Sequence, residues 1–74
     1  MKNLTQLIRE YGIKRIRRVW PYMEAVYDLH VNQDRTYQSI ADVSLLSRED
    51  CLLAMDIAVA VDLAGEQIKR DGRP

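Results

Sequence analysis

The sequence predicts an all-α protein, a single domain over residues 1–74 built as a small bundle of three to four helices. Apolar residues recur three and four positions apart along most of the chain, which is the spacing of amphipathic helices. No stretch alternates apolar and polar residues between hairpin-turn signals, as half-buried strands do. Both observations favour helices over a sheet.

The first helix is predicted near residues 4–11. Its apolar stripe consists of Leu4, Leu7, Ile8 and Tyr11. Asn3 or Thr5 can cap its start, because both side chains carry an oxygen that accepts a hydrogen bond from a first-turn N–H group. Gly12 is a typical stop, since glycine readily adopts the left-handed conformation that ends a helix.

The second helical segment is predicted over residues 13–31, with a break or kink at Pro21. Its apolar stripe consists of Ile13, Ile16, Val19, Trp20, Met23, Val26 and Tyr27. Proline inside a helix costs roughly 3 kcal/mol, but it is well accommodated at the first helical position. Two arrangements are therefore open: one helix that kinks at Trp20, or two helices of which the second begins with Pro21.

Two further helices are predicted near residues 36–43 and 48–70. The second of these has the clearest start signal in the chain. Ser47 stands at the cap position and Asp50 follows three residues later, in the form of a capping box. Gly72 supplies a stop for the same helix.

The segment 51–64 is the most apolar part of the chain, and only Asp56 and Asp62 interrupt it. Its large side chains cannot all lie on one face of a helix, because each residue is rotated by about 100° from the last. A short domain has little other material to cover such a helix. We therefore expect a homodimer, intertwined or side by side, with the long C-terminal helix at its centre. The residues expected at the dimer interface are Leu52, Met55, Val59 and Leu63. The alternative is that the N-terminal helices of the same chain cover the whole segment.

Net charge is zero for the chain, but the charges are not evenly distributed. Residues 1–37 carry seven Lys or Arg and four Asp or Glu, whereas residues 38–74 carry four and seven. Such an asymmetry marks either a binding face or two halves that attract each other, within one chain or across a dimer. Attraction between the halves is the simpler explanation for so mild a difference.

The chain carries little that could perform catalysis. A catalytic nucleophile needs a base within hydrogen-bond reach. Cys51 and His30 are the only natural pair, and nothing in the sequence brings them together. One cysteine and one histidine are too few for a Cys/His metal site, and the three glycines are too scattered for a phosphate-binding loop. We expect no enzymatic activity, no cofactor, no metal and no small-molecule substrate.

The basic run "YGIKRIRRVWP" at residues 11–21 is the main functional signal. The residues expected to form the working surface are Lys14, Arg15, Arg17, Arg18 and Tyr22. Arginine and the aromatic residues are enriched at protein interfaces and at their energetic hot spots. We therefore expect a small regulatory protein, of the inhibitor or modulator type, that binds an acidic patch on a larger protein partner.

The alternative is a DNA-binding transcriptional regulator in which residues 4–20 form a helix-turn-helix. A short helix ends at Gly12 and a basic helix follows at once, as in motifs that place their second helix in the major groove. Two features weigh against this reading. Pro21 ends the basic helix early, and the pI of about 6.5 lacks the clear positive excess that is usual for nucleic-acid-binding domains.

The sequence favours a cytoplasmic location. No stretch combines the length and the charge-free character of a membrane span. The first residues lack the apolar core of a secretory signal. A single cysteine also suits a reducing compartment.

Overall fold

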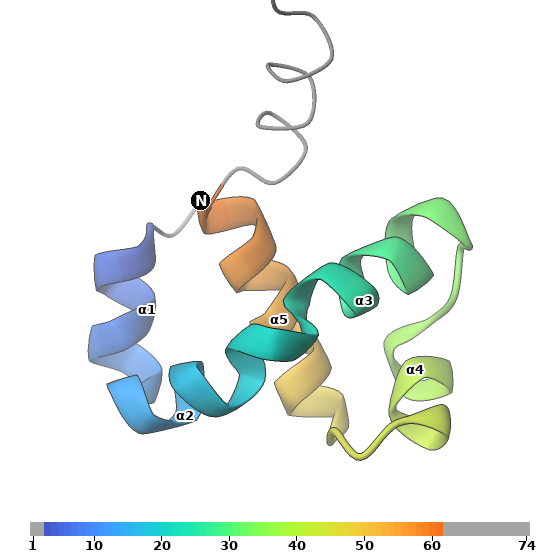
Figure 1. Ribbon diagram of the computed structural model, residues 1–74, viewed down its shortest axis with the longest axis horizontal. Coiled ribbons are helices and arrows are strands. Elements are labelled where there is room, and N and C mark those ends of the chain that lie inside the picture. The colour runs from blue at the N-terminus through green and yellow to red at the C-terminus, as the bar shows by residue number, and fades with distance from the viewer. Residues whose placement is uncertain (1–2, 62–74) are drawn as a thin grey trace, which may run out of the picture.

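The computed structural model describes residues 3–61, and every regular element within this range is a helix (Figure 1). In chain order the elements are α1 (Leu4–Tyr11), α2 (Ile13–Val19), the 3₁₀ turn η1 (Trp20–Tyr22), α3 (Met23–Tyr27), the π-helical turn η2 (Asp28–Asn32), α4 (Tyr37–Val43) and α5 (Arg48–Ala60). The predicted all-α class is therefore confirmed. No described helix has both the length and the apolar character needed to cross a bilayer.

α1 spans the range predicted from the sequence, and its ends are defined by local hydrogen bonds. Asn3, not Thr5, is the cap. Its Oδ1 accepts from the Gln6 N–H at 2.9 Å, and the Gln6 Oε1 accepts from the Asn3 N–H at 2.8 Å. Gly12 has a φ of +89°, a conformation that favours glycine, and α2 begins at the very next residue. A single residue therefore forms the corner between α1 and α2.

Pro21 interrupts the α-helix of the second segment without ending its helical path, since α2 ends at Val19 and α3 begins at Met23. α2, η1, α3 and η2 follow one another without a gap, and the residues at their junctions keep right-handed helical backbone angles. The chain tightens into a 3₁₀ turn around Pro21, where the Met23 N–H donates to the Trp20 carbonyl. Such a tightening accommodates a residue without an N–H donor and keeps the path helical. The described residues thus form four helical segments, of which this is the longest.

α4 and α5 both begin at a hydroxyl cap. The Thr36 Oγ1 accepts from the Ser39 N–H at 3.1 Å, and the Ser47 Oγ accepts from the Asp50 N–H at 3.1 Å. Each bond satisfies a donor that has no partner inside its own helix. The C-terminal part of the predicted last helix, residues 62–70, lies outside the described residues.

α5 occupies the centre of the fold. α1 and α2 lie on one side of it, α4 lies on the other side, and α3 crosses over it (Figure 1). Its fully buried residues are Cys51, Leu53, Ala54, Ile57 and Ala58. They share one core with Leu7, Ile16, Val19, Met23, Val26 and Ile40 of the other helices. Each large apolar side chain in this core contributes roughly 1.5–3 kcal/mol by leaving water.

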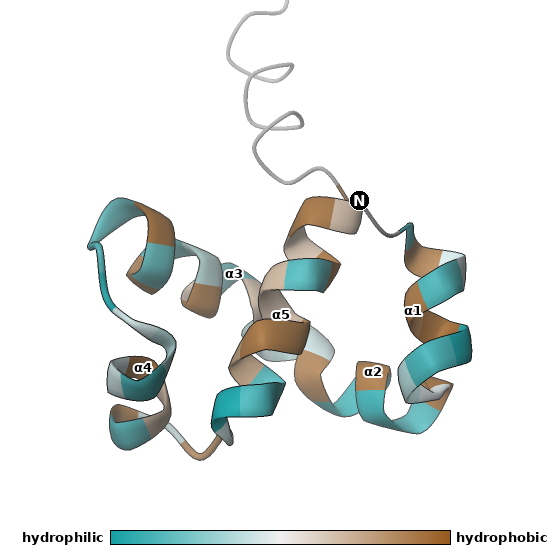
Figure 2. Ribbon diagram, turned by 180° about the vertical axis from the view of Figure 1, so that it is seen from behind, coloured by the Kyte–Doolittle hydropathy of each residue, from teal (hydrophilic) through white to brown (hydrophobic). Residues whose placement is uncertain are grey.

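One face of α5 remains uncovered by the rest of the described chain. Figure 2 shows α5 from behind, on the side that α3 does not cross. Leu52 is 38% exposed, Val59 is 36% exposed, and Asp56 between them is also exposed. The other helices of the chain therefore cover most of the circumference of α5, but not all of it.

Truncating a leucine at the centre of the core should destabilise the protein far more than truncating a leucine on its surface. Leu53→Ala is expected to lower the free energy of unfolding by about 2–5 kcal/mol, because it leaves a cavity at a fully buried position. Leu45→Ala is the matched control at a fully exposed position, and should change the free energy by no more than about 0.5 kcal/mol. Urea unfolding followed by circular dichroism measures both. Equal effects would contradict the central position of α5.

Candidate functional site

The four basic side chains of α2 divide into two pairs with different surroundings. Arg15 and Arg18 are one turn apart, and both contact Asp50 in the first turn of α5. Lys14 and Arg17 are also one turn apart. Both are exposed, and neither forms an ion pair with another residue of the described range. The basic run is therefore half structural and half open to solvent.

Asp50 lies between the two arginines and is only 8% exposed. Its Oδ1 accepts a hydrogen bond from Arg15 Nε at 3.1 Å, and Arg15 Nη2 lies at 3.1 Å from the same oxygen. Arg18 Nη2 lies at 3.3 Å from Oδ1 and 3.2 Å from Oδ2. We call these three residues the Asp50 cluster. It ties the basic front half of the chain to the acidic rear half.

The sequence pattern indicated a different partner for Asp50. The box of Ser47 and Asp50 predicts that the Asp50 side chain returns to the backbone of Ser47. Only one half of that box forms, because the Ser47 hydroxyl accepts from the Asp50 N–H while the Asp50 carboxylate contacts the arginines. The arginines are 35 and 32 residues away in sequence, so no local pattern could have found this contact.

The Asp50 cluster carries an excess of one positive charge, since two guanidinium groups share one carboxylate. Arg15 is the more enclosed of the two, with 36% of its side chain exposed, and its guanidinium lies 5.3 Å from the centre of the Tyr11 ring. The Arg18 side chain is 63% exposed. All of its contacts with Asp50 use Nη2, and its Nε and Nη1 donate to no other residue of the described range. Arg18 therefore keeps donors for a further acceptor.

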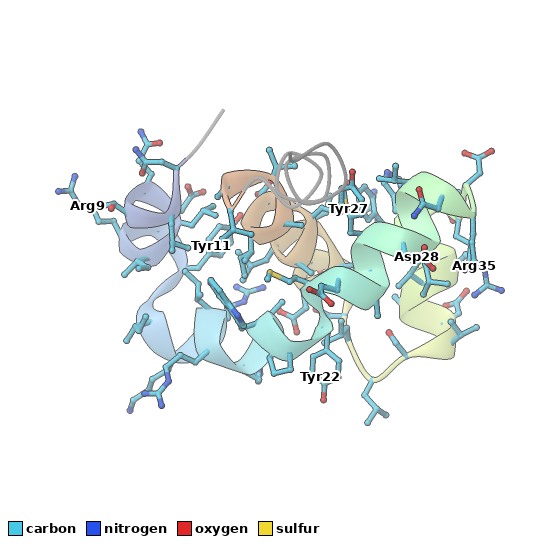
Figure 3. The ribbon with its side chains drawn as sticks, turned by 45° about the horizontal axis from the view of Figure 1, so that its top comes forward. Arg9, Tyr11, Tyr22, Tyr27, Asp28 and Arg35 are labelled. Carbon is cyan, nitrogen blue, oxygen red and sulfur yellow. The ribbon has the colours of Figure 1, made fainter. Side chains whose placement is uncertain are left out.

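A shallow pocket of about 200 Å³ opens beside the Asp50 cluster, between η1 and the turn that joins α4 to α5. Its lining residues are Arg18, Tyr22, Leu45, Leu46 and Asp50. We call these five residues the pocket surface. Tyr22 is 46% exposed and projects from the edge of the molecule in Figure 3, and Leu45 is fully exposed. The pocket thus combines a charged wall with two solvent-facing apolar side chains.

Leu45 is the most exposed of the three members of the pocket surface that sequence analysis missed, the others being Leu46 and Asp50. It stands beside Leu46 in a turn between two serines, and a pair of leucines ordinarily indicates core. Leu46 is partly buried against the core, whereas Leu45 points into solvent. The sequence signal that could have found Leu45 is a pair of leucines enclosed by two serines. A turn this short cannot bury both leucine side chains, so one of them must face solvent.

Cys51 and His30 are held in separate environments. Burial raises the pKa of the Cys51 thiol, and the neighbouring carboxylate of Asp50 raises this pKa further. A raised pKa lowers the fraction of reactive thiolate. The His30 Nδ1 lies 2.7 Å from the Arg35 carbonyl oxygen. Because a carbonyl oxygen can only accept, Nδ1 carries the proton of this hydrogen bond. The His30 ring also stacks on the Tyr37 ring, with 4.2 Å between the ring centres. These contacts hold η2 against the start of α4.

Hydrogen bonds also hold the C-terminal end of η2. The Asp28 carboxylate accepts from Asn32 Nδ2 at 2.8 Å and from Gln33 Nε2 at 2.9 Å. These bonds favour the charged form and lower the pKa of Asp28. No group of three His, Cys, Asp or Glu side chains within residues 3–61 is arranged to hold a metal ion.

Two of the four residues expected at a dimer interface lie on the uncovered face of α5. Leu52 and Val59 are exposed there, and Met55 is partly buried at its edge. Leu63 lies outside the described residues. Leu52 is two residues beyond Asp50, so the two side chains leave α5 in nearly opposite directions. The pocket surface and the uncovered face therefore lie on different sides of the same helix.

A double-mutant cycle should separate the structural arginines from the open basic residues. Arg15→Gln combined with Asp50→Asn is expected to give a coupling energy of about 1–3 kcal/mol, because the bond joins charged groups and is partly buried. The coupling of Arg18 with Asp50 should be smaller, below about 1 kcal/mol, since solvent screens an exposed pair. Urea unfolding at low salt measures both. Lys14→Gln is the control, and a Lys14 coupling as large as that of Arg15 would contradict the cluster.

Comparison with known protein families, curated proteins and solved structures gives no match for this chain. Its function is therefore inferred from the chemistry and geometry of the described residues.

Proposed function

We propose that the protein is a small non-enzymatic regulator, of the inhibitor or modulator type, that binds a larger protein partner through the pocket surface and the adjoining basic face of α2. The observation that supports this most is the exposure of Tyr22 and Leu45 beside the Asp50 cluster. Leaving a leucine fully in water gains nothing for the fold. Leu45 lies next to an exposed tyrosine and an arginine, and these two residue types contribute much of the binding energy at protein interfaces.

The size of the pocket favours a macromolecular partner over a small ligand. About 200 Å³ is below the roughly 300–1,000 Å³ of typical small-molecule sites. Such a pocket accepts one side chain of a partner, while Tyr22 and Leu45 provide the apolar rim that excludes water around it. The rest of the contact would then come from the surface around the pocket.

The charges of the site favour an acidic partner. The Asp50 cluster has one uncompensated positive charge, and Arg18 still has N–H donors directed to no other described residue. Lys14 and Arg17 add two exposed cations on the same short helix. A carboxylate on the partner would neutralise the cluster and form charge-assisted hydrogen bonds with Arg18.

DNA is the second candidate partner, and the exposure of Lys14 and Arg17 is what favours it. Two cations one turn apart on a helix can contact neighbouring phosphates, which supplies sequence-independent affinity. Arg15 and Arg18 are engaged by Asp50, however, so that the three residues offer a polyanion one net positive charge in place of two. We therefore rank a protein partner above DNA.

A homodimer in the cytoplasm is the remaining part of the proposal, with the uncovered face of α5 as its interface. Leu52 and Val59 are more exposed than large apolar residues of a central helix ordinarily are. Pairing two such faces would remove them from water without covering the pocket surface, which lies on the other side of α5.

Removing the two apolar rim residues should release the protein partner. In a pull-down from the native host, the wild-type chain is expected to retain one partner in stoichiometric amount. Tyr22→Ala with Leu45→Ala should lower its retention by about tenfold or more, because both residues are proposed hot spots. Val31→Ala is the matched control, since Val31 is an exposed apolar residue on η2, away from the pocket.

The same pull-down separates the two candidate partners. Arg18→Gln should weaken retention of a protein, whereas Arg9→Gln, an exposed arginine of α1, should not. A DNA-binding protein would instead retain nucleic acid, lose it on Lys14→Gln with Arg17→Gln, and show binding to random duplex that falls steeply with salt. Retention that none of these substitutions reduces would rule out the proposed surface.

A charge on the uncovered face should prevent dimer formation. Sedimentation equilibrium of the wild-type chain at micromolar concentrations is expected to show a dimer. Leu52→Asp should shift it to a monomer, since a carboxylate at the centre of the interface loses its hydration. Leu45→Asp, an equally drastic change on the other side of α5, should leave the dimer intact. A wild-type chain that stays monomeric would disprove the dimer.

A further inference from the structure

We infer that the dimer, whose existence belongs to the proposed function, pairs two α5 helices in antiparallel fashion about a two-fold axis at Leu52, so that Arg48 of each copy meets Asp56 of the other. The proposal specifies the occupant of the uncovered face as a second copy of this chain, in one orientation and one register. It depends on the arrangement of charged residues along α5.

The exposed residues of α5 lie on one side of the helix. They are Arg48, Glu49, Leu52, Asp56 and Val59. At about 100° per residue they fall within an arc of about 100°, with Leu52 near its middle. The face is therefore narrow and continuous over the length of α5, which suits it to receive another helix.

Arg48 and Asp56 are placed symmetrically about Leu52. Each is four residues from it, so each lies about 6 Å from it along the helix axis, one toward each end. Neither forms an ion pair or a side-chain hydrogen bond within the described part of the chain. The pKa of Tyr37 is raised mainly by burial, and the nearby negative charge of Asp56 raises it further.

This symmetry decides between the two ways of pairing identical helices. A parallel pair places each residue opposite its own copy, so Arg48 would face Arg48 and Asp56 would face Asp56, and both contacts are repulsive. An antiparallel pair centred on Leu52 exchanges the two positions. Arg48 then faces Asp56 of the second copy at both ends, and the two Leu52 side chains meet at the centre.

Other antiparallel registers fit less well. Pairing Arg48 with Glu49 of the second copy would also join opposite charges, but it would overlap only the first turns of the two helices and leave Leu52 and Val59 in water. The register centred on Leu52 combines opposite charges at both ends with burial of Leu52 at the centre. Val59 then extends past the start of the α5 helix of the second copy.

Cysteine cross-linking tests the orientation. Arg48→Cys, Leu52→Cys and Val59→Cys are introduced singly into the full chain and oxidised with diamide at concentrations where the wild type is dimeric. Only Leu52→Cys is expected to cross-link efficiently, because the copies of residue 48 would be about 12 Å apart and those of residue 59 about 21 Å apart. The wild type is the control, since its single cysteine is fully buried.

Charge exchange tests the register. Arg48→Asp and Asp56→Arg should each weaken the dimer by about tenfold or more, as measured by sedimentation, because like charges then face each other. The double variant should recover to within about threefold of the wild type, since it restores the pairs with exchanged signs. Glu49→Arg changes a charge on the same face outside the proposed pair, and is the matched control. Circular dichroism verifies that each variant folds.

The outcomes distinguish this inference from the proposed function. Efficient cross-linking at residues 48 and 59 would show a parallel dimer, and a double variant no tighter than the single variants would exclude the Arg48–Asp56 pairs. Either result overturns the inference while the dimer itself survives. A wild-type chain without any dimer overturns both, and leaves binding of a partner at the pocket surface to be judged by the pull-down alone.

Discussion

The burial of α5 is the constraint on which the rest of the structure depends. This helix is apolar on most of its circumference, so it needs cover from several directions at once. Short helices meet that need by packing on opposite sides and crossing over it, and each contributes one or two residues to the shared core. The one direction left open faces away from the pocket, which gives the molecule two surfaces that do not compete for space.

Elements with local determinants were predicted well from the sequence, and elements with distant determinants were not. The range of α1 and the start of α5 follow from caps and stripes within a few residues. The path through Pro21 could not be decided, because a 3₁₀ turn is retained there by packing of Val19 and Met23 into a core supplied largely by α5. The residues around Pro21 do not by themselves indicate this packing, because α5 is far away in the sequence.

The candidate site was predicted in the same uneven way. Helical spacing located the basic residues and Tyr22, but it could not tell which cations face inward, since that depends on where α5 packs. Asp50 was misleading because one residue serves two purposes: its backbone completes a helix cap, and its side chain holds two arginines from the other half of the chain. Leu45 departs from the rule that leucines lie inside, and departures of this kind concentrate at functional surfaces.

The one-residue corner at Gly12 limits how this chain can vary. Its N–H donates to the Ile8 carbonyl and its own carbonyl accepts from the Ile16 N–H, so the same residue closes one helix and opens the next. No atom would obstruct a side chain there, and the restriction lies in the dihedral angle alone. An insertion or deletion at this joint would change the direction of α1 relative to α2 and move Leu7 away from its place in the core. Evolutionary changes in length should therefore accumulate in the polar link before α4 and spare this corner.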